Sequence, residues 1–305
     1  MRAAMDEAIH AANLTCHYGR TEAVAGLTFS VPEGSLFALL GPNGAGKTTA
    51  IRMLMNIVRP SGGEATVLGV DTRRLGLSEF RAIGYVSENQ KLPSWMNVAQ
   101  LLAFCRPLYP TWDEMLCRKL VDEFDLPLHT TISRLSRGMR VKAALVSSLA
   151  YRPRLLVLDE PFGGLDPVVR DELVRGVLEL AGEERWSVLI SSHDLDEVER
   201  LVDAVGFIDA GRLVLMEPLA DLHARFRRIE VTTTEPARDA PPMLPHWTGL
   251  QTSGRVVRFV ETRHRAPESE RQMAAAFPGA SIDAHPMTLR EIFVAVAREQ
   301  REKRR

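Results

Sequence analysis

The chain has 305 residues, a formal net charge of −1 at pH 7, and 45% hydrophobic and 25% charged residues, which is the composition of an ordinary globular protein. No apolar run approaches the roughly 20 residues that a helix needs to span a bilayer, and the first ten residues lack the apolar stretch of a signal peptide. We therefore expect a cytoplasmic protein that does not itself cross a membrane. Cys16, Cys105 and Cys117 have no C-x-x-C spacing, which argues against a zinc site or a disulfide framework.

The first 220 residues alternate short β-like runs with helical patterns. This order predicts an α/β domain built on a largely parallel sheet. Strands are predicted at residues 28–31 and 35–40, a helix at 48–58 and a short strand at 84–86.

From about residue 90 to residue 151 the pattern becomes helical. Thr111 and Glu114 have the spacing of a capping box, which predicts that a helix starts with Thr111 as its N-cap. Apolar residues at i, i+3, i+4, i+7 and i+8 from Val141 predict a second helix. We interpret the segment as a helical subdomain inserted into the α/β core.

The α/β pattern resumes after the helical segment. It predicts a strand at 155–158, a helix from about Pro167 with Asp166 as its N-cap, a strand at 188–191 and a hairpin near 207–215.

Around residue 221 the composition changes. Residues 1–220 carry a net charge of −5, whereas residues 221–305 carry +4. We therefore predict a small α+β accessory domain at 221–305. Its expected elements are strands at 228–233 and 255–261, a loop at 234–254 and a closing helix that contains residues 289–296.

Residues 41–48, Gly-Pro-Asn-Gly-Ala-Gly-Lys-Thr, fit the phosphate-binding pattern G-x-x-x-x-G-K-[ST] between a predicted strand and a predicted helix. The glycines let backbone N–H groups curl around phosphates, and the helix N-terminus adds a partial positive charge. We expect Lys47 to reach the β- and γ-phosphates of ATP and the Thr48 hydroxyl to bind Mg²⁺. The predicted nucleotide-binding residues of this loop are Gly41, Asn43, Gly44, Ala45, Gly46, Lys47, Thr48 and Thr49.

Asp159 and Glu160 follow the apolar strand at 155–158. Ligands of parallel sheets bind at the carboxyl ends of the strands. We expect Asp159 to hold Mg²⁺ through water and Glu160 to act as the general base toward the attacking water. Taken alone, such a dipeptide would be an ordinary solvated turn, but the phosphate-binding loop upstream favours the catalytic interpretation.

With these motifs in this order, residues 9–217 resemble the nucleotide-binding subunit of an ATP-binding-cassette (ABC) transporter. Residues 135–139, Leu-Ser-Arg-Gly-Met, resemble the family's signature, which is usually Leu-Ser-Gly-Gly-Gln. Residues 163–166, Gly-Gly-Leu-Asp, resemble the D-loop. The resemblance implies a P-loop cassette with a parallel sheet core, an antiparallel β subdomain and an inserted helical subdomain.

The resemblance also assigns roles to residues outside the phosphate-binding loop. His193 occupies the position of the switch histidine, which positions the attacking water, and Tyr18 that of an aromatic residue stacking on adenine. Tyr18 is otherwise explained as a tyrosine packed at a strand end. Glu88 occupies the Q-loop position, where the family commonly has Gln, and would contact Mg²⁺ or its water.

The family pairs two such chains around two ATP molecules. The resemblance implies that Ser136 and Gly138 contact the ATP held by the second copy or by a similar partner, and it places Asp166 of the D-loop among the nucleotide-binding residues. Arg137 adds bulk and positive charge to the signature, and its effect on phosphate binding across the dimer is left open.

The resemblance implies an ATP-hydrolysing subunit that powers a separate transmembrane permease from the inner face of the cell membrane, with no nucleic-acid partner. Residues 287–296 are similar to the tail of bacterial ABC-2-type exporter ATPases, which favours export; the alternative is a plain amphipathic helix. Two other functions stay open. One is a soluble ABC ATPase acting on ribosomes or DNA, which usually carries a second cassette, a coiled coil or a zinc module. The other is a catalytically weak regulatory subunit, which would lack Lys47, Asp159 or Glu160.

Overall fold

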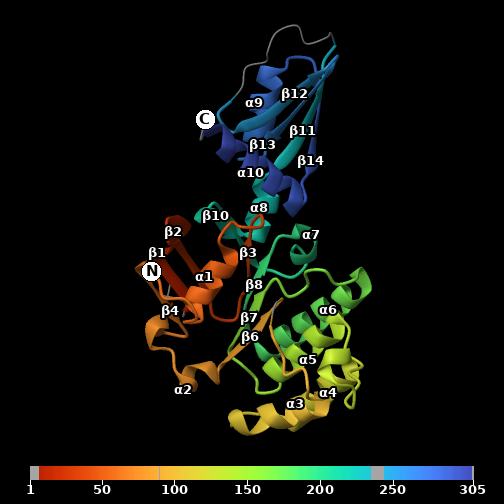
Figure 1. Cartoon of the computed structure of the whole chain (residues 1–305). Helices are drawn as coiled ribbons and strands as arrows, with labels where there is room; N and C mark the ends of the chain where they lie inside the picture. The colour runs from red at the N-terminus through yellow and green to blue at the C-terminus, as the bar shows by residue number, and fades with distance from the viewer. Residues whose placement is uncertain (1–6, 89, 235–243, 304–305) are drawn as a thin grey trace. The chain divides into compact units, whose positions relative to one another are not determined.

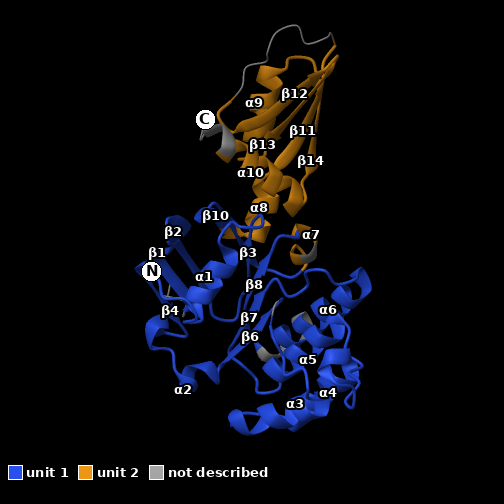
Figure 2. Ribbon diagram, in the orientation of Figure 1, with its two compact units in different colours: residues 1–194, 201–216 blue, residues 195–200, 217–305 orange. Residues whose placement is uncertain are grey.

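The structure is a computed structural model of the chain, and it describes residues 7–88, 90–234 and 244–303 (Figure 1). The chain divides into two compact units. Unit 1 comprises residues 1–194 and 201–216, and unit 2 comprises residues 195–200 and 217–305 (Figure 2). That the chain folds as separate domains with a boundary near residue 220 stays a prediction.

Unit 1 contains the central sheet, whose strands are β3 (Leu36–Leu40), β6 (Ile83–Ser87), β7 (Leu155–Asp159), β8 (Ser187–Ser192), β9 (Ala204–Asp209) and β10 (Arg212–Pro218), of which the last two residues belong to unit 2. Their order is β10-β9-β3-β8-β7-β6. β3 pairs in parallel with β8 and β9, and β7 pairs in parallel with β6 and β8. All five residues of β7 are buried, as expected of a strand covered on both faces. The predicted parallel sheet is confirmed.

A second sheet of unit 1 consists of β1 (Glu7–Tyr18), β2 (Thr21–Pro32), β4 (Gly62–Val67) and β5 (Val70–Asp71). It is antiparallel, with the order β2-β1-β4-β5. Helix α1 (Lys47–Leu54) buries Ala50, Ile51, Met53 and Leu54 in one cluster with residues of both sheets. The core of unit 1 therefore holds the phosphate-binding loop, which precedes α1, between two sheets. The helix ends at Leu54 rather than at the predicted Val58.

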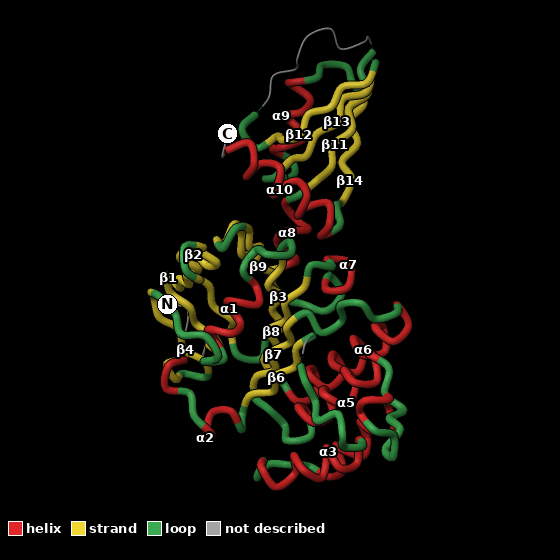
Figure 3. The backbone as a smooth tube through the Cα atoms, viewed as in Figure 1, coloured by secondary structure: helices red, strands yellow, loops and turns green. Residues whose placement is uncertain are grey.

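The remaining helices of unit 1 are short except for the last two (Figure 3). They are η1 (Thr72–Arg74), α2 (Leu77–Phe80), α3 (Val98–Cys105), η2 (Arg106–Leu108), α4 (Glu114–Glu123), η3 (Ile132–Arg134), α5 (Arg137–Leu149) and α6 (Pro167–Glu184). The segment between β6 and β7 is helical, as predicted, and α5 packs against α3, α4 and β6.

The predicted start of α4 is wrong. Asp113, not Thr111, is the N-cap, and its carboxylate accepts hydrogen bonds from the backbone N–H groups of Met115 and Leu116 at 2.8 and 3.0 Å. The Thr111 hydroxyl donates instead to the Tyr151 carbonyl oxygen at 2.6 Å. The threonine is therefore used in a tertiary contact, which leaves the cap to the aspartate.

Unit 2 consists of α7 (Leu195–Val198), α8 (Leu219–Arg225), β11 (Arg227–Thr232), β12 (Trp247–Ser253), β13 (Val256–Glu261), α9 (Glu268–Ala276), β14 (Ser281–Pro286) and α10 (Leu289–Lys303). The strands form an antiparallel sheet in the order β12-β13-β11-β14. Trp247, Phe259, Met273 and Phe277 form its core with α9.

The predicted α+β character and closing helix of this part of the chain are confirmed, but β12 lies within residues 234–254, which were expected to form a loop. Residues 235–243 of that segment lie outside the described residues. None of the helices in the described ranges is both long enough and apolar enough to span a membrane.

Candidate functional site

The loop between β3 and α1 is tight because its glycines approach other backbone segments closely. A Cβ atom on Gly41 would lie 2.2 Å from the Ile208 carbonyl oxygen. A Cβ atom on Gly46, which has a φ of 107°, would lie 2.5 Å from the Ala23 carbonyl oxygen. Only glycine fits these two places. The loop leads directly into the N-terminus of α1, whose first backbone N–H groups have no partners within the helix.

Lys47, the first residue of α1, is 5% exposed and makes three polar contacts. Its Nζ donates to the carbonyl oxygens of Gly41 and Pro42 at 2.7 and 3.2 Å and lies 3.0 Å from Glu160 Oε1. The second carboxylate oxygen of Glu160 lies 2.7 Å from His193 Nδ1. Glu160 therefore joins the lysine of the phosphate-binding loop to the histidine at the end of β8.

Asp159 is buried at the end of β7 and receives two hydroxyl hydrogen bonds. Thr48 Oγ1 and Ser191 Oγ donate to Asp159 Oδ1 at 3.0 and 2.8 Å. The pKa of Asp159 is raised above its usual value, chiefly by burial, and the hydrogen bonds from Ser191 and Thr48 reduce this rise. A hydroxyl and a carboxylate side by side at the phosphate-binding loop are the oxygen donors that Mg²⁺ prefers, so these residues fit a magnesium ion.

Lys47, Thr48, Glu160 and His193 line one cavity with a volume of about 490 Å³. The cavity is lined by Ala23, Asn43, Gly44, Ala45, Gly46, Lys47, Thr48, Thr49, Glu88, Arg137, Glu160, Gly163, Gly164 and His193. Ten of the predicted site residues are therefore brought together from four separate parts of the sequence. The cavity is lined by the basic side chains of Lys47 and Arg137 and by the N-terminus of α1, which suit a polyanion such as a nucleoside triphosphate.

Glu88 lies at this cavity because its backbone N–H donates to the Asp159 carbonyl oxygen at 3.0 Å. Its side chain has a partner, since Glu88 Oε1 accepts a hydrogen bond from Arg137 Nη2 at 2.5 Å. The predicted magnesium-contacting carboxylate is thus paired with the arginine of the signature-like segment.

Besides Gly41 and Asp159, which contact the lining residues Lys47 and Thr48, four predicted residues do not line the cavity. Tyr18 is 49% exposed at the end of β1. Ser136 and Asp166 are the N-caps of α5 and α6, and each accepts a hydrogen bond from a backbone N–H of its own helix. Gly138 faces α6, where a Cβ atom would lie 2.8 Å from Val169 Cγ1.

The structure also assigns site residues that the sequence did not single out. Ser191 donates to Asp159, and its Oγ accepts from the Glu160 backbone N–H at 3.0 Å. Its place in β8, where it pairs with Asp159 at the end of β7, was a usable signal because adjacent parallel strands end at the same edge. Gly163 and Gly164, which the sequence placed in the D-loop-like segment without a binding role of their own, line the cavity as well.

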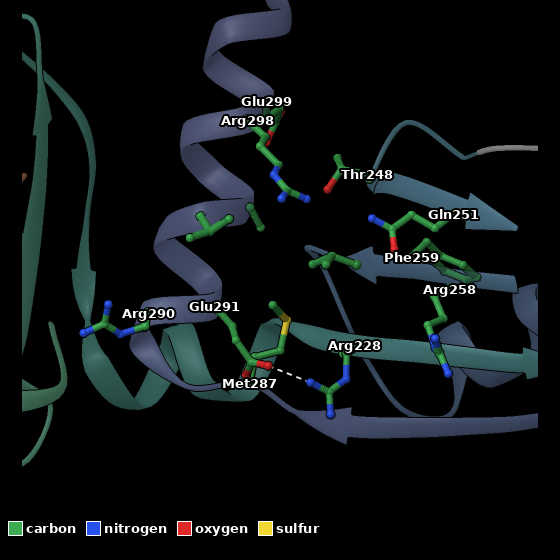
Figure 4. A pocket seen from close by; sticks show the side chains of 14 residues that line it. Arg228, Thr248, Gln251, Arg258, Phe259, Met287, Arg290, Glu291, Arg298 and Glu299 are labelled. Atoms are coloured by element: carbon green, nitrogen blue, oxygen red, sulfur yellow. Dashed lines mark hydrogen bonds and ion pairs between the residues drawn. The ribbon is translucent and has the colours of Figure 1, made fainter. Parts of the chain in front are cut away.

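A second cavity, of about 350 Å³, lies in unit 2 between α10 and the sheet (Figure 4). Apolar side chains such as Met287 and Val294 share its lining with groups of both charges, and Arg228 Nη1 pairs with Glu291 Oε1 at 2.6 Å. Figure 4 shows Arg290 pointing away from this cavity. Without a glycine-rich loop or an excess of free cations it does not match a phosphate site, so the cavity of unit 1 is the candidate functional site.

Comparisons with known proteins agree with this geometry. The sequence profile of the ABC transporter family matches residues 24–163. The fluoroquinolones export ATP-binding protein MT2762 of Mycobacterium tuberculosis (strain CDC 1551 / Oshkosh) is 35% identical over 231 residues, which cover 73% of this chain and 75% of that protein. The Nod factor export ATP-binding protein I of Rhizobium meliloti is 31% identical over 295 residues, which cover 94% and 87%. A solved structure of an ATP-binding subunit of an ABC transporter is 27% identical, covers 70% of this chain and 91% of its own, and has a TM-score of 0.63.

Proposed function

The chain belongs to the ATP-binding proteins of ABC transporters, and we propose that the cavity of unit 1 holds the ATP whose hydrolysis powers export through a separate membrane permease. The observation that carries the proposal is the convergence of the phosphate-binding loop, Glu160 and His193 on one cavity. ATP hydrolysis is the activity of this family, and the side chains at this cavity have the chemistry it requires.

The side chains at the cavity have separate roles in binding ATP and Mg²⁺. Lys47 is the buried cation for the terminal phosphates, and it exchanges its contact with Glu160 for phosphate oxygens. Thr48 and Asp159, with Glu88 beside them, are the residues that would hold Mg²⁺. When bound, Mg²⁺ supplies positive charge that neutralises the phosphate oxygens.

Glu160 and His193 are placed for hydrolysis. A water molecule attacks the γ-phosphorus, the bond from that phosphorus to the bridging oxygen of ADP breaks, and the products are ADP and inorganic phosphate. The proton lost by the water passes to the Glu160 carboxylate. The contact between His193 Nδ1 and Glu160 supports a role for the histidine in orienting the base.

We further propose that Ser136, Gly138 and Asp166 act on the ATP of a second chain. Supporting this, the three residues lie at the N-termini of α5 and α6, outside the cavity of their own chain. Helix N-termini favour phosphate binding. A dimer of cassettes, homomeric or with a similar partner, would complete each site, and it would act on the permease at the inner face of the membrane.

The choice of cargo belongs to the permease in this proposal. The two relatives are named for export of fluoroquinolones and of Nod factor, which are different cargoes, yet this chain is similar to both ATP-binding proteins.

The site is tested by the variant Glu160→Gln. It removes the base but leaves Lys47, Thr48 and Asp159, so nucleotide affinity measured by calorimetry is expected to change little. ATP turnover is expected to fall by about 10²–10⁴-fold, the usual contribution of a general base. The exposed Glu123→Gln on α4 is the matched control and keeps full turnover. Wild-type turnover in Glu160→Gln would refute the assignment.

The partner is tested by mild solubilisation of native membranes and mass spectrometry of what co-purifies with the chain. A multi-span permease is the expected result. A ribosome or DNA as the dominant partner would contradict the transporter function and support the soluble ABC ATPase instead.

A further inference from the structure

Two of the three side chains that depart from the family's commonest motifs contact each other; the third is Met139. Glu88 stands where Gln is common, and Arg137 stands where the signature commonly has its first glycine. Arg137 Nη2 lies 2.5 Å from Glu88 Oε1, although the residues are 49 positions apart in the sequence. The two departures therefore form one ion pair.

This pair lies at the wall of the chain's own phosphate cavity. A Cβ atom on Gly164 would lie 2.7 Å from Arg137 Nη1, and one on Gly163 would lie 3.3 Å from Glu88 Oε1. Both glycines line the same cavity as Lys47. The glycine turn thus leaves room for the guanidinium of Arg137, which lines the same cavity as the phosphate-binding loop of its own chain.

The contact between Arg137 and Glu88 is easily exchanged. Their side chains are 44% and 38% exposed, and ion pairs at that exposure add little to stability. A guanidinium forms strong paired hydrogen bonds with phosphate oxygens, and a terminal phosphate carries more negative charge than a carboxylate. An arriving triphosphate can therefore replace Glu88 as the partner of Arg137.

On the basis of the ATP site proposed above, we propose that Arg137 is a γ-phosphate ligand of the ATP bound in the phosphate-binding loop of its own chain. Glu88 holds the guanidinium at the cavity until the nucleotide arrives. ADP lacks the γ-phosphate and leaves the pair between Glu88 and Arg137 intact. The pair therefore distinguishes the ATP-bound chain from the ADP-bound chain.

The test compares the dissociation constants of magnesium ADP and of a non-hydrolysable ATP analogue with magnesium, measured by calorimetry on the full chain at concentrations where it is monomeric. Arg137→Ala is expected to lower the preference for the triphosphate about tenfold, the effect of one lost charge-assisted hydrogen bond, with ADP affinity unchanged. Arg140→Ala, one turn later on α5 and outside the phosphate cavity, is the control and keeps the wild-type preference.

A second variant separates phosphate binding from a merely structural ion pair. Arg137→Lys keeps a positive charge but cannot form the paired hydrogen bonds of a guanidinium, so an intermediate preference for the triphosphate is expected. An equal fall in the affinity for both nucleotides in Arg137→Ala would show a merely structural role and overturn the proposal, as would no loss of preference in that variant. A preference that appears only at concentrations where the chain dimerises would also overturn it, because the arginine would then act on the partner's ATP.

The ATP site itself is checked in the same titrations by Lys47→Ala. Loss of affinity for both nucleotides is expected in this variant. Unchanged affinity would refute the proposed ATP site, whereas failure of the Arg137 proposal changes only the ratio between the two nucleotides.

Discussion

Glu160 has an unusual backbone conformation for the residue that carries the proposed chemistry. Its φ is 51°, in the left-handed region that residues other than glycine seldom adopt. The backbone N–H of Glu160 donates to the hydroxyl of Ser191, and Lys47 and His193 hold the carboxylate. Such conformations persist where the surroundings hold them, and they are frequent at functional sites.

The pair between Lys47 and Glu160 predicts a stability effect that does not depend on nucleotide. The two side chains are only 5% and 13% exposed, so Lys47→Met leaves a nearly buried carboxylate with His193 as its remaining side-chain partner. We expect Lys47→Met to lower the free energy of unfolding by about 1–3 kcal/mol. Urea titration of the nucleotide-free protein measures this change.

Adding Glu160→Gln is expected to restore part of that loss, because the neutral amide needs no cation. The cycle of two single variants and the double variant isolates the interaction. Strictly additive effects of the two substitutions would mean that the pair contributes nothing to stability.

The candidate site was predictable where its chemistry is local in the sequence. Residues 41–49 form one continuous motif, and Asp159 and Glu160 directly follow an apolar strand. The contact between Glu88 and Arg137 was not predictable, because it depends on how α5 lies beside the end of β6. Each residue alone was visible as a departure from a motif, but only the fold brings the two charges together.

At the scale of single elements, the cap of α4 predicts a dependence of stability on pH. The hydrogen bond from the Leu116 backbone N–H, followed by the one from Arg152, lowers the pKa of Asp113 from 3.8. The folded state therefore binds this proton less readily than the unfolded chain. The stabilisation from Asp113 is complete above the unfolded pKa and is lost as the pH falls through the lower folded value.

Asp113→Asn keeps a capping side chain but removes the charge. Between about pH 6 and about pH 3, the urea midpoint of the variant is therefore expected to fall less than that of the wild-type protein. Asp122→Asn, an exposed position near the other end of α4, is the control and follows the wild-type curve. A parallel fall in all three proteins would contradict the effect of the cap.

The strand β12 shows why part of the fold escaped sequence reasoning. Of its seven residues only Trp247 is buried, so the alternation that marks a half-buried strand is missing. Gly249 has a φ of 68°, and the register shifts between Thr248 and Gln251. The strand is defined by backbone pairing with β13 rather than by burial of its own side chains, and pairing partners are not visible in a local pattern.

At the scale of the whole molecule, each unit has its own hydrophobic core. Phe259 is buried in the core of unit 2, where its ring centroid lies 4.6 Å from that of Trp247. Phe259→Ala is expected to destabilise unit 2 by about 3–5 kcal/mol, the usual cost of emptying such a site. If the units fold as separate domains, calorimetry resolves two thermal transitions. In this variant only the midpoint temperature of the transition of unit 2 falls.

A non-hydrolysable ATP analogue with magnesium supplies the complementary measurement. The analogue is expected to raise the midpoint temperature of the transition of unit 1, because a ligand stabilises the part of the chain that binds it. Val260→Ala, the neighbouring half-buried position on β13, is the matched control and has a smaller effect. One transition that both perturbations move would contradict separate domains.

The chain connects unit 2 to the candidate site through a short segment. Residues 195–200 belong to unit 2 by their contacts, yet they begin two residues after His193. Glu199 joins these residues to the rest of unit 2 through two contacts. Its Oε1 accepts a hydrogen bond from the Leu289 backbone N–H at 3.1 Å and lies 3.2 Å from His223 Nε2. The position of the segment that follows His193 therefore depends on α8 and on the start of α10.

Glu199→Ala removes this contact without altering any residue of the phosphate cavity. Because His193 contacts the proposed base, we expect ATP turnover to fall about tenfold while nucleotide affinity stays within about twofold, the pattern of a lost positioning contact. Glu199→Gln retains an acceptor oxygen for the Leu289 N–H and is expected to keep most of the turnover. Equal turnover in Glu199→Ala and the wild-type protein would show that unit 2 does not influence His193, and a loss of nucleotide affinity would place the effect in binding rather than in positioning.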